Sequence, residues 1–126
     1  MLTLSQVGPH EWQFVYPRLY NELMDLFHAG CELFEEDRLI EAEAAFRTVL
    51  DRMPDHLDAI HHLALVLSNE GEDLYARDLW QLSVVIGRMA FPAGFEHGVD
   101  RLPWGILDNR PFFRCLYGLA LDRYED

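Results

Sequence analysis

The sequence predicts an all-α fold, namely a short α-solenoid of two helix hairpins and a terminal helix, with one ordered non-helical insertion. Segments of similar sequence recur at an offset of 34 residues in the middle of the chain. Within each segment, apolar residues follow the spacing of three and four positions that marks one face of a helix. Half of the 126 residues are hydrophobic and a quarter are charged, which is the balance of a soluble folded domain with a modest core.

The N-terminal segment, residues 1–16, is expected to form a cap. It contains two large aromatic residues, Trp12 and Phe14, which would pack onto the first helix pair. Pro17 suits the first turn of a helix, so the first repeat is expected to begin there.

The two repeats are expected to span residues 17–54 and 55–88, each with two helices. Polar turns at 36–38 and 69–73 separate the helices within each repeat. The first repeat has two apolar stripes, which are Leu23, Leu26, Phe27, Gly30, Leu33 and Phe34, and then Ala42, Ala45, Phe46, Val49, Leu50 and Met53. The matching residues of the second repeat are Ile60, Leu63, Ala64 and Leu67, followed by Ala76, Leu79, Trp80 and Ser83.

Residues 89–110 interrupt the repeat period. Prolines and glycines exclude a long helix there, but Phe91, Phe95 and Trp104 need burial, so we expect an ordered insertion. Helical spacing then resumes, and residues 111–126 are expected to form the terminal helix of a third, incomplete repeat.

The repeat pattern resembles that of the tetratricopeptide repeat family. Counted from Leu23 and from Leu57, the positions that this family fills with a small residue, an alanine and an aromatic residue are occupied as follows: Gly30, Ala42 and Phe46 in the first repeat, and Ala64, Ala76 and Trp80 in the second. Pro54 matches the family's closing proline. Arg88 departs from it, and Leu33 and Leu67 stand where a tyrosine is often found. The resemblance covers about half of the chain and implies stacked helix hairpins with a concave groove for a protein partner.

A shorter segment, "LPWGILDNRPFFRCLYGLA", is similar to a stretch in a group of tetratricopeptide proteins that includes the suppressor of tumorigenicity 7 family. In that group, a Trp-containing loop and an Arg-Pro-aromatic stretch precede a repeat helix. This second resemblance covers about 20 residues and implies no activity.

Composition narrows the classes of partner and activity. The chain carries 22 acidic and 10 basic residues, a net charge of −12, which disfavours nucleic acid and anionic membranes as partners. The six histidines show no paired ligand spacing typical of zinc, and no phosphate loop or nucleophile motif is present. We therefore expect no metal, no cofactor and no enzymatic activity. Two isolated cysteines, an N-terminus unlike a secretory signal and the lack of a spanning apolar run favour a cytoplasmic protein.

The most favoured function is a protein–protein interaction module that binds a peptide or helical segment through a concave groove. The family's groove positions fall on a mixed apolar and polar set, which we expect to bind the partner: Met24, Phe27, Phe34, His61, Leu65, Arg114, Tyr117 and Leu121. Two alternatives stay open. One is a structural or oligomerisation domain whose groove is filled by residues 91–107. The other is an enzyme or ligand-binding protein that uses His61, Arg114 and the loop around Trp104.

The terminal helix raises the question of what covers its apolar side. Leu116, Leu119 and Ala120 share one side of it, and no later helix follows in the sequence. An uncapped repeat end exposes core-like surface. We expect the insertion to cover part of this helix and a second copy of the chain, in a homodimer, to cover the rest.

Overall fold

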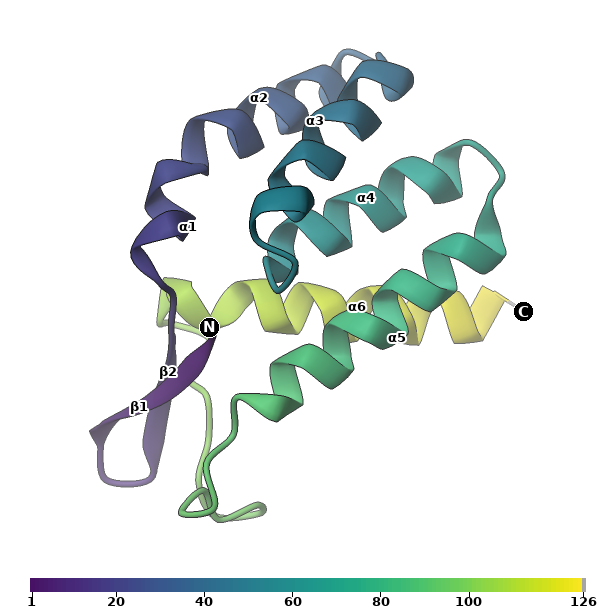
Figure 1. The fold of residues 1–126 in the computed structure, drawn as a ribbon. Coiled ribbons are helices and arrows are strands. Elements are labelled where there is room, and N and C mark those ends of the chain that lie inside the picture. Colours follow the sequence, from purple (N-terminus) through teal and green to yellow (C-terminus); the bar gives the residue numbers. More distant parts are fainter. Residues whose placement is uncertain (126) are drawn as a thin grey trace.

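The protein is predominantly helical and carries one small β-sheet (Figure 1). The computed structural model describes the backbone of residues 1–125 and the side chains of residues 1–122. In this part of the chain the elements are β1 (Thr3–Gly8), β2 (Glu11–Val15), α1 (Arg18–Glu22), α2 (Met24–Glu35), α3 (Leu39–Arg52), α4 (Leu57–Asn69), α5 (Asp73–Met89), the 3-10 turn η1 (Leu107–Asn109) and α6 (Arg110–Glu125).

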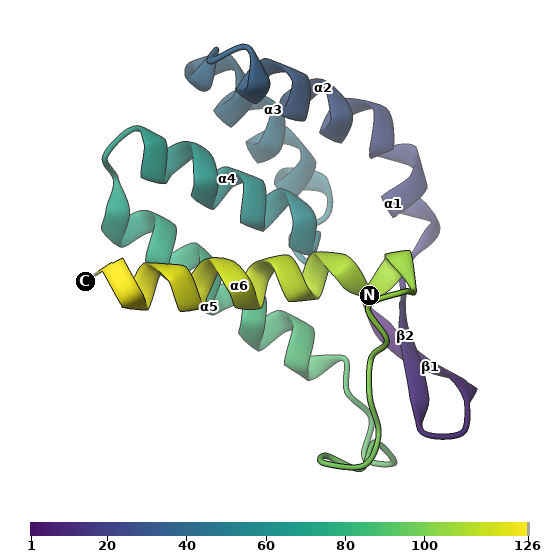
Figure 2. The same cartoon turned by 180° about the vertical axis from the view of Figure 1, so that it is seen from behind.

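The helices from α2 to α6 pack in two layers. Along the chain, α2 contacts α3, α3 contacts α4 and α4 contacts α5, and α5 also contacts α6. In addition α2 contacts α4, and α4 contacts α6. Figure 2 shows α2, α4 and α6 in front, with α3 and α5 behind them. Helix α2 begins at Met24 and α4 at Leu57, while α3 begins at Leu39 and α5 at Asp73. The pair α4–α5 therefore follows the pair α2–α3 by about one repeat.

Small residues permit the close approach of the helices. Ala42, Ala64 and Ala76 are completely buried. Gly30 faces Phe46, and a Cβ atom added to Gly30 would lie 2.7 Å from Cε1 of that ring. The positions that the sequence pattern marks as small therefore lie where neighbouring helices meet, as expected for close-packed hairpins.

The β-hairpin departs from the all-α expectation. Strands β1 and β2 pair antiparallel, with Leu4 opposite Phe14, and an irregularity in the register lies between Gln6 and Gly8. The tight connection places His10 at a positive φ of 60°. Alternating side chains give the hairpin one apolar face, on which Phe14 is completely buried.

The hairpin packs against a different partner from the one expected. The ring of Phe14 lies 5.3 Å from that of Phe112 on α6 and 6.3 Å from that of Phe91 in the insertion, between centroids. Trp12 lies 5.8 Å from Phe95 in the same way. The N-terminal segment thus covers the start of α6 and the insertion, where we had expected it to cover the first helix pair.

The insertion is ordered through hydrogen bonds to the hairpin. The N–H of Arg101 donates to the carbonyl of His10 at 2.8 Å, and the N–H of Trp12 donates to the carbonyl of Arg101 at 3.0 Å. The Asp100 carboxylate accepts from the indole of Trp12 at 3.1 Å. Both views show this loop beside the hairpin, at the opposite end of α6 from the C-terminus (Figures 1 and 2).

Among the described residues, none of the helices combines the length and apolar character needed to cross a membrane.

Candidate functional site

A cleft of about 440 Å³ lies where α4, α5 and α6 meet. Four of the eight residues expected to bind a partner line it together, although they come from two helices: His61, Leu65, Tyr117 and Leu121. The remaining lining residues are Ser68, Asp73, Trp80, Gly118 and Asp122. The cleft is therefore mixed in character, with aromatic and aliphatic walls and a few polar groups.

The floor of the cleft is fixed by a hydrogen bond between two buried rings. The indole N–H of Trp80 donates to Nδ1 of His61 at 3.1 Å. Gly118 allows α6 to approach this indole, because a Cβ atom at Gly118 would lie 2.3 Å from Nε1 of Trp80. Burial lowers the pKa of His61 to about 4, with the charge of His62 adding to the effect, so His61 is neutral at physiological pH.

Tyr117 and Leu121 form the exposed rim. They lie one turn apart on α6, and Tyr117 is 66% exposed. Asp122 extends the rim on the same helix and pairs with Arg77 of α5, with 2.6 Å between Oδ2 and Nε. The rim is thus supplied mainly by the terminal helix, with an ion pair tying that helix to α5.

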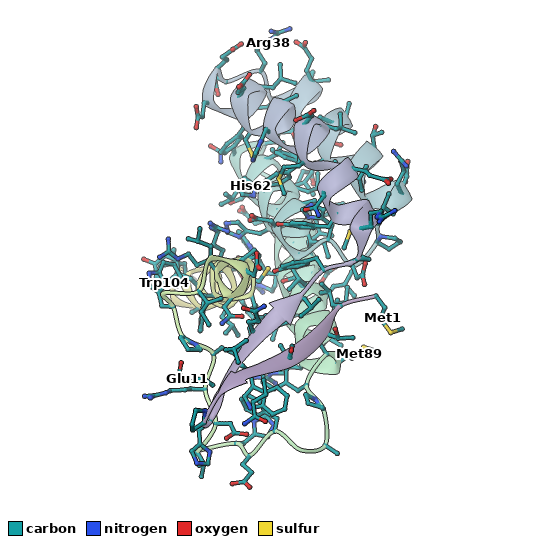
Figure 3. The ribbon with its side chains drawn as sticks, turned by 90° about the vertical axis from the view of Figure 1, so that its left-hand side faces the viewer. Met1, Glu11, Arg38, His62, Met89 and Trp104 are labelled. Atoms are coloured by element: carbon teal, nitrogen blue, oxygen red, sulfur yellow. The ribbon has the colours of Figure 1, made fainter. Side chains whose placement is uncertain are left out.

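Arg114 lies beside the cleft and is paired. Its guanidinium is 3.0 Å from Oδ2 of the buried Asp58 on α4. The other carboxylate oxygen of Asp58 is 3.4 Å from Nδ1 of His62. Burial alone would raise the pKa of Asp58, but His62 and Arg114 together lower it below its usual value. In Figure 3, His62 lies between α2 and α6, so this charged group joins the three helices of one layer.

The three expected groove residues of α2 lie away from the cleft. Phe27 is only 5% exposed and packs against Phe46, His56 and His62, so it is a core residue where we had expected a surface contact. Met24 and Phe34 are partly buried and pack against the core. His61 is also nearly buried at 8% exposure, yet one side of it reaches the cleft.

A second hollow, of about 660 Å³, adjoins the cleft along α6. It is lined by Trp104, Phe113, Arg114, Leu116 and Tyr117. Trp104 is the only described insertion residue in it, and Figure 3 shows Trp104 beside α6 at the edge of the molecule. The guanidinium of Arg110 lies over its ring at 4.6 Å. Of the three groups of the enzyme alternative, His61 lines the cleft, whereas Arg114 and Trp104 line the hollow.

The residues expected to mediate self-association do lie together. Leu116, Leu119 and Ala120 line a hollow of about 690 Å³ between α5 and α6, with Val84, Val85, Gln81 and Arg88 opposite. Leu116 and Leu119 pack partly on the core, while Ala120 is exposed. Val85 is an exposed apolar side chain of this lining, and Leu82 and Met89 are exposed elsewhere on α5.

Five residues that line the cleft were not among those expected to bind a partner, namely Ser68, Asp73, Trp80, Gly118 and Asp122. Trp80 was assigned to the core as the aromatic residue of the second repeat, and Gly118 and Asp73 were not singled out. The signal for Gly118 was available, because a glycine inside a helix implies close approach by a neighbouring group. Asp73 is recognisable only from the fold, since it lies at the start of α5 and far in sequence from α6.

In the described residues, no group of three or more His, Cys, Asp or Glu side chains is placed to hold a metal ion. Comparison of the chain with protein-family models, with curated proteins and with solved structures finds no match.

Proposed function

We propose that this chain is a tetratricopeptide-like interaction module that binds a peptide or helical segment of a protein partner in the cleft between α4, α5 and α6. In this proposal the helix pairs α2–α3 and α4–α5 are the two full repeats of a short α-solenoid, and α6 is the first helix of a third. The contacts of α2 with α4 and of α4 with α6 support it, because first helices of successive repeats line one side of such an array.

The observation that carries the binding proposal is the composition of the cleft. Its rim has an exposed aromatic side chain, Tyr117, and an exposed aliphatic one, Leu121. Aromatic and aliphatic anchors surrounded by a few polar groups are typical of sites that hold a peptide side chain.

The position of the insertion favours a partner over self-occupation. None of the described cleft-lining residues belongs to residues 91–107. That segment is held by hydrogen bonds to the hairpin instead. A peptide can therefore reach the cleft without displacing any part of the chain that the structure describes.

The proposed module needs no cofactor and no metal, and it is not an enzyme. Its net charge of −12 argues against nucleic acid and anionic membranes as partners. Both cysteines are free thiols, which is in keeping with the proposed cytoplasmic location.

Self-association is a second candidate function, favoured by one observation. The hollow between α5 and α6 is lined by Val85, which is 55% exposed, and by Ala120, which is also exposed. An exposed apolar surface of this kind is typical of an interaction site. The hollow and the cleft share no described lining residue, so the two functions are compatible.

Peptide display tests the binding proposal. Random dodecapeptides on phage are selected against the whole chain, and enriched sequences are synthesised for fluorescence anisotropy. We expect at least one peptide to bind with a dissociation constant in the micromolar range and to lose about tenfold or more in affinity with Tyr117→Ala. The matched control is Tyr75→Ala, since Tyr75 is 65% exposed on α5 and does not line the cleft. No enriched peptide, or equal loss in both variants, would overturn the proposal.

A further inference from the structure

The polar side chains of the cleft are unequal in charge. Two carboxylates line it, those of Asp73 and Asp122, and no basic residue is among its described lining. Asp122 is already paired with Arg77 of α5. Asp73 forms no ion pair among the described residues and is exposed at the start of α5. One carboxylate is therefore available at the mouth of the cleft.

The surroundings of Asp73 reinforce its negative potential. Glu70 and Glu72 lie just before it in the α4–α5 turn, and both are exposed. His61 adds no compensating charge at neutral pH, because it is buried as a neutral ring that accepts the Trp80 N–H. Of the described cations beside the cleft, Arg114 of α6 pairs with Asp58, and Arg77 of α5 pairs with Asp122. The cleft consequently presents a negative field to an approaching partner.

The apolar part of the lining complements this field. Leu65 and Leu121 come from facing helices and provide aliphatic contact, while the exposed ring of Tyr117 offers a π-face. A cationic side chain is attracted both to a carboxylate and to the face of an aromatic ring. The aliphatic part of a Lys or Arg side chain can also pack on an apolar surface. An acidic partner would meet repulsion at the same position.

From this juxtaposition we infer that the cleft recognises a segment in which Lys or Arg stands next to a large apolar residue. The basic group lies between Asp73 and Tyr117, and the apolar neighbour lies between Leu65 and Leu121. This inference rests on the proposed function, and it adds the chemistry of the partner.

The test uses the dodecapeptides selected on the whole chain. We expect enriched sequences to contain Lys or Arg adjacent to Leu, Ile, Met or an aromatic residue. A synthetic peptide from this set is compared with its twin in which each basic residue is replaced by Gln. The twin should bind about fivefold or more weakly at low salt, and the difference should shrink as salt is raised.

Two variants of the protein locate the effect. Asp73→Asn removes the available carboxylate without changing its shape, and it should weaken the basic peptide about threefold to fivefold while leaving the Gln twin unaffected. Asp78→Asn is the matched control, because Asp78 is an exposed carboxylate of the same helix outside the cleft. It should change neither affinity.

The outcomes separate the two proposals. Some peptides could lose affinity with Tyr117→Ala and yet contain no basic residue, or bind the Asp73→Asn variant with unchanged affinity. Either result would overturn the basic-segment inference and leave the proposal of peptide binding intact. Enriched acidic peptides would likewise overturn it. Failure to select any peptide that depends on Tyr117 would overturn both.

Discussion

Three histidines, His56, His61 and His62, lie near the start of α4 and differ in protonation state. His56 is completely buried, and its Nδ1 accepts the N–H of Ala59 at 3.0 Å, which caps the helix. Burial lowers the pKa of His56 to about 4. For His62, burial acts in the same direction, but the Asp58 carboxylate outweighs it and raises the pKa above its usual value. Neighbouring residues thus hold neutral and charged imidazoles side by side.

These environments predict that stability falls on acidification. An unfolded histidine takes up a proton near pH 6.5, whereas His56 and His61 resist protonation until about pH 4 in the folded chain. The unfolded state binds more protons between these values, so stability falls as pH drops from about 6.5 towards 4. We expect each of the two histidines to remove about 1–2 kcal/mol between pH 7 and pH 5, measured by urea denaturation. His62 has the opposite sign, and its contribution is lost as pH rises from about 6.5 to about 10.

The variant His56→Asn isolates one of these contributions. Asparagine can accept the same N–H of Ala59 at the helix start but does not titrate. It is expected to lower overall stability through lost packing, while reducing the loss between pH 7 and pH 5 by about 1–2 kcal/mol. A pH dependence identical to that of the original chain would show that His56 is not held neutral in the folded state.

At the scale of elements, three helix contacts depend on glycine, and one of them is that of Gly87 of α5 with Phe112 of α6. Gly30 of α2 lies against Phe46 of α3, and Gly118 of α6 lies against Trp80 of α5. Glycine inside a helix lowers stability by about 1 kcal/mol relative to alanine, so its presence needs a reason in packing. At Gly118 the reason is the indole that also bonds to His61, which links this contact to the cleft.

Gly118→Ala is therefore expected to destabilise the protein. The added Cβ would lie 2.3 Å from Nε1 of Trp80, and the resulting overpacking costs about 1–3 kcal/mol, more than the gain in helix propensity. Urea midpoints measure the change. Gly94→Ala serves as the control, because an added Cβ there would meet nothing within 4 Å. A Gly118→Ala chain as stable as the original would contradict the close contact between α5 and α6 at this position.

The four helices α2–α5 were largely predictable because their signals are local and repeated. Small residues such as Gly30, Ala42 and Ala76 mark helix contacts at a constant period. The hairpin was missed because its strands are short and only one face is apolar. Its cues were the alternation of Leu2, Leu4 and then Trp12, Phe14, with Gly8 and Pro9 between them. Its packing partner could not be found locally, since Phe112 is nearly a hundred residues away.

The candidate site was predictable on α4 and α6 and not on α2. Family positions identified His61, Leu65, Tyr117 and Leu121, which line one cleft. The same positions on α2 include Phe27, whose large ring is drawn into the core between Phe46 and His62. Which large side chains of a groove become buried depends on the spacing of adjacent helices, and that spacing is a tertiary property.

The side chain of Asn109, just before α6, forms hydrogen bonds to strand β2 and to the insertion. Its Oδ1 accepts the N–H of Phe14 at 2.8 Å, and its Nδ2 donates to the carbonyls of Trp12 at 3.0 Å and Pro103 at 3.2 Å. The side chain is completely buried. A single amide thus satisfies backbone groups of the hairpin and the insertion at the start of α6.

We expect Asn109→Ala to cost about 2–4 kcal/mol, because it takes the acceptor from the buried N–H of Phe14 and removes two further hydrogen bonds, to the carbonyls of Trp12 and Pro103. Hydrogen exchange should accelerate in β2 and in residues 100–106, while α2 and α3 stay protected at first. Asn69→Ala is the control, since that side chain is exposed and, among the described residues, donates to the carbonyl of Leu65 alone. Unchanged exchange in β2 would show that packing of Phe14 alone holds the hairpin.

At the scale of the whole molecule, the ends of α6 have different surroundings. The hairpin and insertion lie at its beginning (Figure 2). The cleft is lined by Tyr117, Leu121 and Asp122, which lie farther along the helix. Between α5 and α6 the hollow lined by Val85 and Ala120 is left uncovered by any described element. The expected covering of α6 by the insertion is therefore confined to the start of the helix, where Trp104 contacts Phe113.

This uncovered surface leads to the prediction of a salt-dependent homodimer. Two copies that each carry a net charge of −12 repel one another at low salt, whereas the apolar contact between their α5–α6 surfaces persists at high salt. Light scattering over a dilution series should show a larger dimer fraction at about 0.5 M NaCl than at low salt.

Leu119→Asp would be an ambiguous probe of the dimer contact, since Leu119 packs partly on the core. Val85→Glu is sharper, because Val85 is 55% exposed, and it should abolish the dimer without unfolding the chain. Leu74→Glu, at an exposed apolar position of α5 that is 73% exposed and outside the hollow, should leave the dimer intact. A monomer at every concentration in both salts would remove self-association as a function of this surface, and an equal effect of both substitutions would place the contact elsewhere on the molecule.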